Sequence, residues 1–153
     1  MTDFWHWALA TYDKPGVPEA CLDLQDQYHQ CTAYLLWAAW AAEGGMALKP
    51  DSLAAGKALA QAWEKEVLGP LRSARRALKP TLSNMPDEAR LALREQVKAA
   101  ELSAEQTLMI ALAALLGSQG GAPIDCLSAV AAASSLWSPP APHAALKALV
   151  TRL

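Results

Sequence analysis

Four cations lie close together in the segment PLRSARRALKP, residues 70–80: Arg72, Arg75, Arg76 and Lys79. They are spaced at i, i+3, i+4 and i+7, so a helix gathers them within about 100° of arc on one side. A helix that restarts at Pro70 would also leave free backbone N–H groups next to Arg72. This chemistry suits an anionic partner, which could be a phosphate, another anionic small molecule or an acidic protein surface.

The same cations could instead pair with acidic residues on the following helix. If the chain folds back about residue 83, Arg72 comes near Glu95 and Lys79 comes near Glu88. The cluster would then be a solvated helix face that neutralises itself, and the sequence alone leaves both interpretations open. Nucleic acid is a weaker third partner, because the basic patch is short and has no interleaved aromatic residues.

Other kinds of reactive site find little support in the sequence. It contains no nucleophile motif and no glycine-rich loop for phosphate. Cys21, His29 and Cys31 match no familiar zinc spacing, and each cysteine is more simply a small buried apolar group. Asp23 and Asp26 could share a helix face, but a solvated face is the simpler interpretation. We therefore assign no catalytic residue, no metal site and no cofactor, and an enzyme is the less favoured class.

Tryptophan is concentrated in the N-terminal half of the chain. We expect Trp37 and Trp40, which are spaced i and i+3, to lie in the core. Trp5 and Trp7 leave one helix about 200° apart and cannot both face the same core. One of them must be exposed, covered by another element or part of an interface, and Trp7 is our candidate interface residue.

Helices are the elements that must position these residues. Alanine and leucine dominate the composition and phenylalanine occurs once, which favours helix over strand. Proline and glycine divide the chain into segments, and none of them alternates as a strand does. We predict a single-domain, all-α bundle of six or seven helices, with a long helical hairpin over about residues 52–116. Gly69-Pro70 should kink the first arm of this hairpin or restart its helix.

The C-terminal end divides by composition. We predict a helical bundle over residues 1–137, a proline-rich linker over 138–142 and a C-terminal docking helix over 143–153. The last segment carries an apolar stripe of Leu146, Leu149, Val150 and Leu153, which must dock somewhere. Docking on its own bundle is the simpler outcome, but docking on a neighbouring copy is an alternative, so a homodimer stays open.

Charge and cysteine usage exclude several classes of protein. The net charge is −2 and no domain-wide positive field points to DNA. The three cysteines are odd in number and form no C-x-x-C pair, which argues against a disulfide framework. The longest apolar run is too short to span a bilayer. We expect a cytoplasmic protein that has no membrane partner.

Several strings in the chain carry a family resemblance. WALATYDKPGVPEACLDLQD, followed by LLWAAW, PLRSARRALK and VKAAELSAEQ, resembles a bacterial family of small cytosolic proteins known only as a domain of unknown function. The resemblance covers roughly residues 4–116 and implies an all-helical fold with no assigned activity. Such sequences commonly turn through a glycine where this chain has His29 and Gln30.

These observations favour a non-enzymatic interaction or adaptor protein, which engages another protein through helix faces and the basic hairpin. The alternative is a helical bundle that binds, or acts on, an anionic small molecule through Arg72, Arg75 and Arg76. An exposed basic stripe would favour the protein partner. A concave pocket lined by arginines and tryptophans would favour the small molecule.

Overall fold

The computed structural model describes residues 2–116, 122, 124–137 and 139–153, and every regular element within these residues is a helix. Five helices form a head: α1 (Phe4–Tyr12), α2 (Val17–Tyr28), α3 (Thr32–Glu43), α7 (Cys126–Leu136) and α8 (His143–Val150). The hairpin consists of α4 (Pro50–Trp63), the π-helix η1 (Glu64–Leu68), α5 (Gly69–Ala77) and α6 (Asp87–Ala114). Because α4, η1 and α5 follow one another without a break, the described residues form seven helical rods. The predictions of an all-α, single-domain bundle and of its long hairpin are confirmed.

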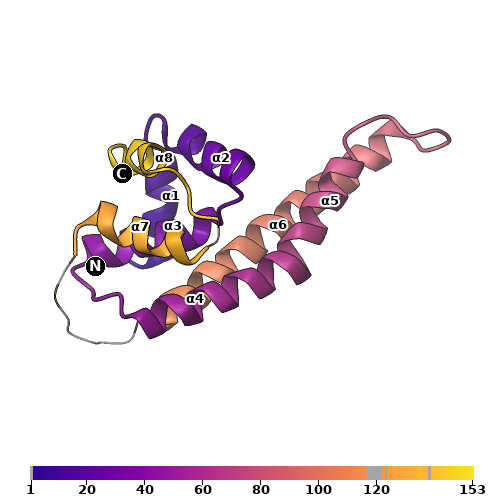
Figure 1. The fold of residues 1–153 in the computed structure, drawn as a ribbon. Helices are drawn as coiled ribbons and strands as arrows, with labels where there is room; N and C mark the ends of the chain where they lie inside the picture. Colours follow the sequence, from indigo (N-terminus) through magenta and orange to yellow (C-terminus); the bar gives the residue numbers. More distant parts are fainter. Residues whose placement is uncertain (1, 117–121, 123, 138) are drawn as a thin grey trace.

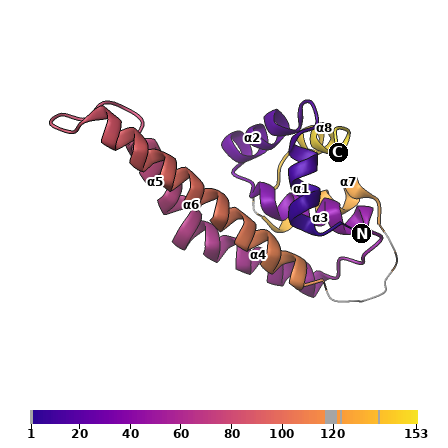
Figure 2. The ribbon, with the colours of Figure 1, turned by 180° about the vertical axis from the view of Figure 1, so that it is seen from behind.

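The hairpin is anchored at one end and extends away from the head at the other (Figures 1 and 2). Its anchored part, α4 and the C-terminal part of α6, packs against α1, α3 and α7. None of the nine described residues of α5 is buried, and Arg90 is the first and only buried residue of α6 before Ala104. The turn between α5 and α6 therefore lies at the exposed end, far from the hydrophobic core.

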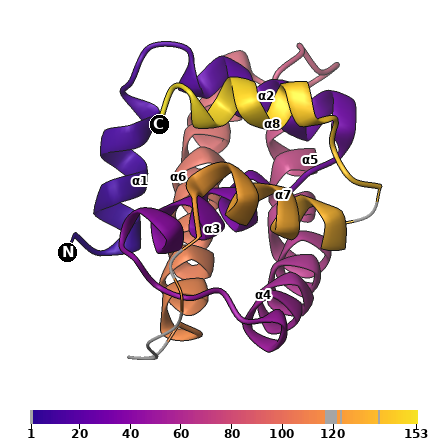
Figure 3. The same ribbon diagram turned by 60° about the vertical axis from the view of Figure 1, so that its left-hand side comes forward.

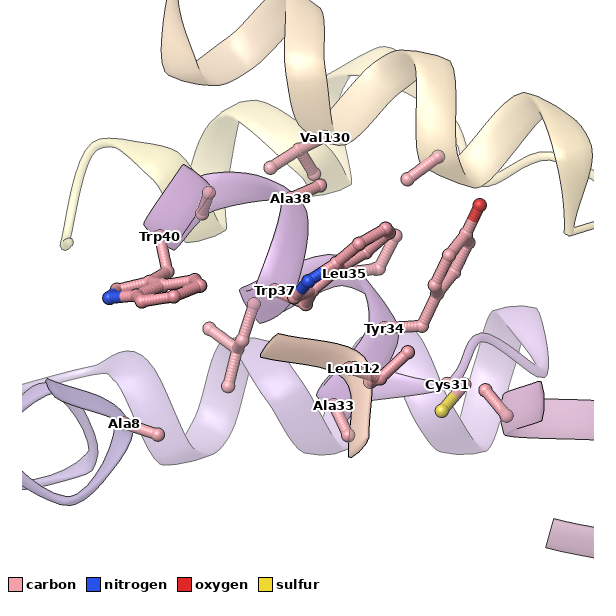
Figure 4. Packing of buried hydrophobic residues seen from close by; sticks show 14 of the residues in the cluster. Ala8, Cys31, Ala33, Tyr34, Leu35, Trp37, Ala38, Trp40, Leu112 and Val130 are labelled. Carbon is pink, nitrogen blue, oxygen red and sulfur yellow. The ribbon is translucent and has the colours of Figure 1, made fainter. Parts of the chain in front are cut away.

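Helix α3 forms the centre of the core (Figure 4). Its sequence is apolar on nearly every side, and all residues from Ala33 to Ala41 are buried. The rings of Trp37 and Tyr34 stack with their centroids 5.7 Å apart, and Trp40 stacks on Phe4 at 5.3 Å. Trp37 is fully buried and Trp40 is 6% exposed, so the prediction that both lie in the core is confirmed.

A glycine allows α4 to approach this core closely. A Cβ atom at Gly56 would lie only 2.8 Å from Cζ3 of Trp37 and 3.2 Å from Cε2 of Tyr34. The two aromatic rings therefore occupy the space that any larger residue at position 56 would need. Glycine in the middle of a helix normally lowers stability, so its presence here indicates that packing between α3 and α4 dominates.

The predicted interruption at Gly69-Pro70 takes the form of a π-helix. Proline lacks an N–H group, and its ring clashes with the carbonyl four residues earlier in a regular α-helix. Helix η1 avoids this clash by widening, and the N–H of Gly69 donates to the carbonyl of Glu64, five residues back. The helical rod thus runs on through Pro70. The prediction of a restarted helix, with a free N-terminus beside Arg72, is wrong.

The C-terminal helix docks on its own chain. Helix α8 lies beside α2 and also contacts α7, with Leu146 and Leu149 buried in the contact (Figure 3). It spans His143–Val150, whereas the predicted docking segment covers residues 143–153. Residue 138, the first of the predicted linker, lies outside the described residues. The side-chain amide of Gln30 donates to the carbonyl of Pro139 over 2.8 Å and so fixes the rest of this segment.

The turn between α2 and α3 is built on His29. Its backbone is left-handed, with φ of 54°, a conformation that glycine adopts at much lower cost. The indole Nε1 of Trp137 donates to the carbonyl of His29 over 2.9 Å. The turn therefore keeps the geometry of a glycine turn although a histidine occupies it, and this hydrogen bond ties it to the end of α7.

Candidate functional site

The first two cations of the basic cluster have acidic partners within the protein. Arg72 contacts three carboxylates: Glu64 at 2.7 Å, Glu101 at 3.4 Å and Glu105 at 3.5 Å. Arg75 Nε lies 2.6 Å from the other carboxylate oxygen of Glu101. The Arg72 side chain is only 15% exposed, so this is a half-buried charge network and not a solvated surface pair.

Pairing across the hairpin was one of the two interpretations of the basic cluster. The structure shows such pairing, but with other partners than those predicted. Neither Arg72–Glu95 nor Lys79–Glu88 forms an ion pair among the described residues, and both predicted pairs are wrong. Helical side chains lean toward the N-terminus of their own helix, and for α5 that direction leads back to the head. Arg72 therefore reaches carboxylates on α6 nearer the head than Glu95. The predicted pairs were chosen only by equal distance from residue 83, and that choice does not take this direction of the side chains into account.

The charges in this network do not balance. Burial lowers the pKa of Arg72, but Glu64, Glu105 and Glu101 outweigh that effect and the pKa is raised overall. The pKa of Glu105 is also raised, first by burial and then by the neighbouring Glu101, while Arg72 counteracts both. Three carboxylates thus share two guanidinium groups, and Glu105 is the least well compensated of them.

The other two cations of the cluster lie free at the surface. Arg76 and Lys79 are exposed, and no described side chain pairs with either of them. Arg76 lines a wide hollow of about 650 Å³, together with Arg72 and Lys65 but also with Asp26 and Glu64. The mixed charge of this hollow makes it a poor site for a small anion.

The turn of the hairpin is closed by Arg90, which sequence reasoning missed. Its Nη1 donates to the carbonyl of Leu78 over 2.6 Å and to that of Lys79 over 2.9 Å, while Nη2 contacts Asp87 at 3.0 Å. Arg90 is only 5% exposed. It thereby satisfies two carbonyls just after the C-terminal end of α5, where the helix itself provides no backbone donors. In the sequence, only Asp87, three residues before Arg90 on α6, indicates that Arg90 has a nearby partner.

On both sides of the turn that Arg90 closes, the hairpin exposes large apolar side chains. We call residues 76–93 the hairpin tip. Its exposed apolar side chains are Leu82 (43%), Met85 (50%), Leu91 (46%) and Leu93 (48%). Two helices alone offer each other a single seam, so residues on their outer faces stay in water. The tip therefore combines unburied apolar surface with the free cations Arg76 and Lys79.

Neither tryptophan of α1 is left without cover. Trp7 is half-buried, and its Nε1 donates to Glu43 at the end of α3 over 3.0 Å. Its ring lies 6.3 Å from that of Phe4. Trp5 leaves the other side of α1 and lines a cavity toward α5 and α6. The two rings thus pack against different elements, as their angular separation predicted.

The cysteine thiols do not gather with other possible metal ligands. Within the described part of the chain, no group of three His, Cys, Asp or Glu side chains is placed to hold a metal ion. All three cysteines are free thiols. Burial raises the pKa of Cys31 to about 12, with a further contribution from Glu64, and burial raises that of Cys21 to about 11. Both thiols therefore stay protonated and weakly nucleophilic at neutral pH.

Among the described helices, none is both long and apolar enough to cross a membrane. Comparisons with curated proteins and with solved structures give no match. The model of one family, described as "Protein of unknown function (DUF2390)", matches residues 3–112. The match covers most of the chain and confirms the resemblance seen in the sequence, so the protein belongs to this family of unknown function.

Proposed function

We propose that the protein is a non-enzymatic interaction or adaptor module that engages another protein through the hairpin tip. One observation carries the proposal: the tip extends beyond the head and exposes Leu82, Met85, Leu91 and Leu93 beside two unpaired cations. Scattered exposed leucines are ordinary on any surface. Four large apolar side chains at the end of a projecting arm are what a docking element requires.

The chemistry of the tip indicates the kind of partner. Buried apolar anchors supply most of the energy of a protein interface, while charges around them govern orientation and association rate. Arg76 and Lys79 would therefore face acidic residues that surround an apolar groove on the partner. We place this interaction in the cytoplasm, where the three free cysteines stay reduced.

The anionic small molecule, the alternative from the sequence, is less favoured. Arg72 and Arg75 already contact Glu64, Glu101 and Glu105. An anion would have to displace these carboxylates or accept their repulsion at short range. Only Arg76 of the three predicted ligands is free, and a single exposed cation binds an anion weakly.

Site-specific photo-crosslinking in bacterial cells tests the proposal. The photoreactive residue p-benzoylphenylalanine would replace Leu91 in the tip or, as a control, the exposed Ser135 of α7. We expect an adduct with one partner protein from position 91 and none from position 135. The double variant Arg76→Glu/Lys79→Glu should lose this adduct while keeping its circular dichroism spectrum.

The proposal fails if position 91 gives no adduct, or if both positions give the same adducts. It also fails if charge reversal at positions 76 and 79 changes nothing. An adduct with twice the mass of the chain would identify a second copy as the partner, and the tip would then be a homodimer interface.

A further inference from the structure

A cavity of about 330 Å³ lies where the hairpin meets the head. Its walls come from α1, α2, α5 and α6, and its large apolar side chains are Trp5, Leu9, Tyr12, Leu22, Leu102 and Met109. The volume lies within the usual range for small-molecule sites, which are mostly apolar with a few polar groups. This cavity is separate from the hairpin tip.

The leucines of the cavity are exposed to an unusual degree. Leu9 is 44% exposed, Leu22 is 56% exposed and Leu102 is 53% exposed. Each comes from a different helix, yet all three line the same cavity. Folding brings these side chains together without burying them. A ligand with an apolar body would complete their burial, and removing this apolar surface from water favours binding.

Charged groups line one side of the same cavity. They belong to the network described above: Arg72, Arg75, Glu101 and Glu105. Arg75 is already held by Glu101 at 2.6 Å. Among the described residues Glu105 forms an ion pair only with Arg72, at 3.5 Å, and Arg72 lies closer to Glu64 at 2.7 Å. The carboxylate of Glu105, whose side chain is 35% exposed, is thus the charge in the cavity wall that lacks a full counter-ion.

We propose that this cavity binds a small organic cation with an apolar body, such as an aromatic or alkyl amine. The ammonium group would pair with Glu105, and the apolar body would rest on the three leucines and on Trp5. The indole face of Trp5 also favours a nearby cation. The charge of this ligand is opposite to the one that the basic sequence suggested, because Glu105 shares Arg72 with Glu64, and Glu64 lies outside the cavity lining.

Three compounds with the same apolar body test the assignment: 4-phenylbutylamine, 4-phenylbutanol and 4-phenylbutyrate. Titration followed by NMR would report on the indole N–H of Trp5 and on the leucine methyl groups. We expect the amine to bind most tightly, the alcohol more weakly and the acid weakest of all. Glu105→Gln keeps the shape of the side chain and removes its charge, so it should weaken the amine about tenfold while leaving the alcohol unchanged.

Two further variants separate this site from general effects. Glu88→Gln removes an exposed carboxylate at the hairpin tip and should not change binding of any of the three compounds. Leu22→Ala removes apolar lining without touching the core and should weaken all three. If Glu105→Gln does not fold, the Leu22→Ala variant still tests whether the compounds bind in this cavity.

Some results would overturn the proposal. It fails if none of the compounds shifts the Trp5 signal at millimolar concentration, or if the acid binds as tightly as the amine. Equal binding of the amine to the parent protein and to Glu105→Gln would also refute it. Crosslinking from position 91 is independent of this site, so the two proposals can fail separately.

Discussion

Arg72 should be the most important charged residue for stability at the base of the hairpin. Replacing it with methionine keeps a long apolar side chain and removes the guanidinium group. Glu64, Glu101 and Glu105 would then lie close together without the cation that they share. The expected result is a less stable protein with an unchanged fold.

The magnitude follows from the exposure of the groups. Removing one partner of a fully buried ion pair costs about 3–5 kcal/mol, whereas an exposed pair contributes about 0–1 kcal/mol. Arg72 is 15% exposed, and its partners range from 12% for Glu101 to 35% for Glu105. Arg72→Met should therefore lower the free energy of unfolding by an intermediate amount, about 2–3 kcal/mol. That is a large fraction of the roughly 5–15 kcal/mol that stabilises a typical domain.

The pH dependence of this loss has a definite sign. The pKa of Glu105 is raised above 4.5 in the folded protein because burial disfavours the charged carboxylate. Ionisation of Glu105 therefore destabilises the folded state above this raised pKa, and the effect disappears below 4.5. Arg72 lowers this pKa, so its removal should raise the pKa further and increase the penalty at neutral pH. The difference between parent and variant should thus be larger at pH 7 than near pH 4.5.

Urea unfolding followed by circular dichroism, at both pH values, measures the effect. Arg76→Met is the matched control, because Arg76 lies one turn later and has no ion pair among the described residues. It should change stability by no more than about 0.5 kcal/mol. Equal losses for the two variants, or a loss from Arg72→Met that does not shrink in acid, would refute the reasoning.

Three other predictions concern packing and the ends of elements. Gly56→Ala should destabilise the protein by about 1–3 kcal/mol in a thermal melt, because the new methyl group overlaps Trp37; a melt above that of the parent would contradict this. Arg90→Met should speed amide hydrogen exchange around the hairpin turn and leave α3 protected, whereas uniform exchange would show that Arg90 does not act locally. Removal of residues 139–153 should lower the melting temperature of a protein that stays monomeric in sedimentation, because α8 packs on α2 of its own chain. A dimeric parent and a stable monomeric truncation would show that α8 exchanges between copies.

Local patterns in the sequence were enough to predict the helices and the core. The run around Trp37 is apolar on every side, and such a run can only be stable as a buried central helix. The apolar stripe that begins near Leu53 continues through Leu78, which predicts a helical first arm of the hairpin on both sides of Gly69-Pro70. These features depend on periodicity and burial, and both are properties of the sequence itself.

The remaining features depend on contacts between particular residues that the sequence pattern does not reveal. Pro70 was expected to kink or restart the helix, but a π-helix absorbs it because Gly69 leaves room for the carbonyl of Glu64, 2.8 Å from where a Cβ would lie. Arg90 looked like any surface arginine until the fold placed it against the carbonyls of Leu78 and Lys79. The cavity at Leu22 is formed by four helices, α1, α2, α5 and α6, and a single sequence does not show how they meet.

The basic cluster shows why a shared helix face does not imply a shared role. The position of each residue both around and along the rod decides its surroundings, because consecutive residues of a helix point about 100° apart. The side chains of Arg72 and Arg75 lie against α6, where they are partly withdrawn from water and contact carboxylates of η1 and α6. Arg76 and Lys79 lie toward the turn, where nothing covers them. The first pair therefore stabilises the base of the hairpin, and only the second pair can meet a partner without breaking an internal contact.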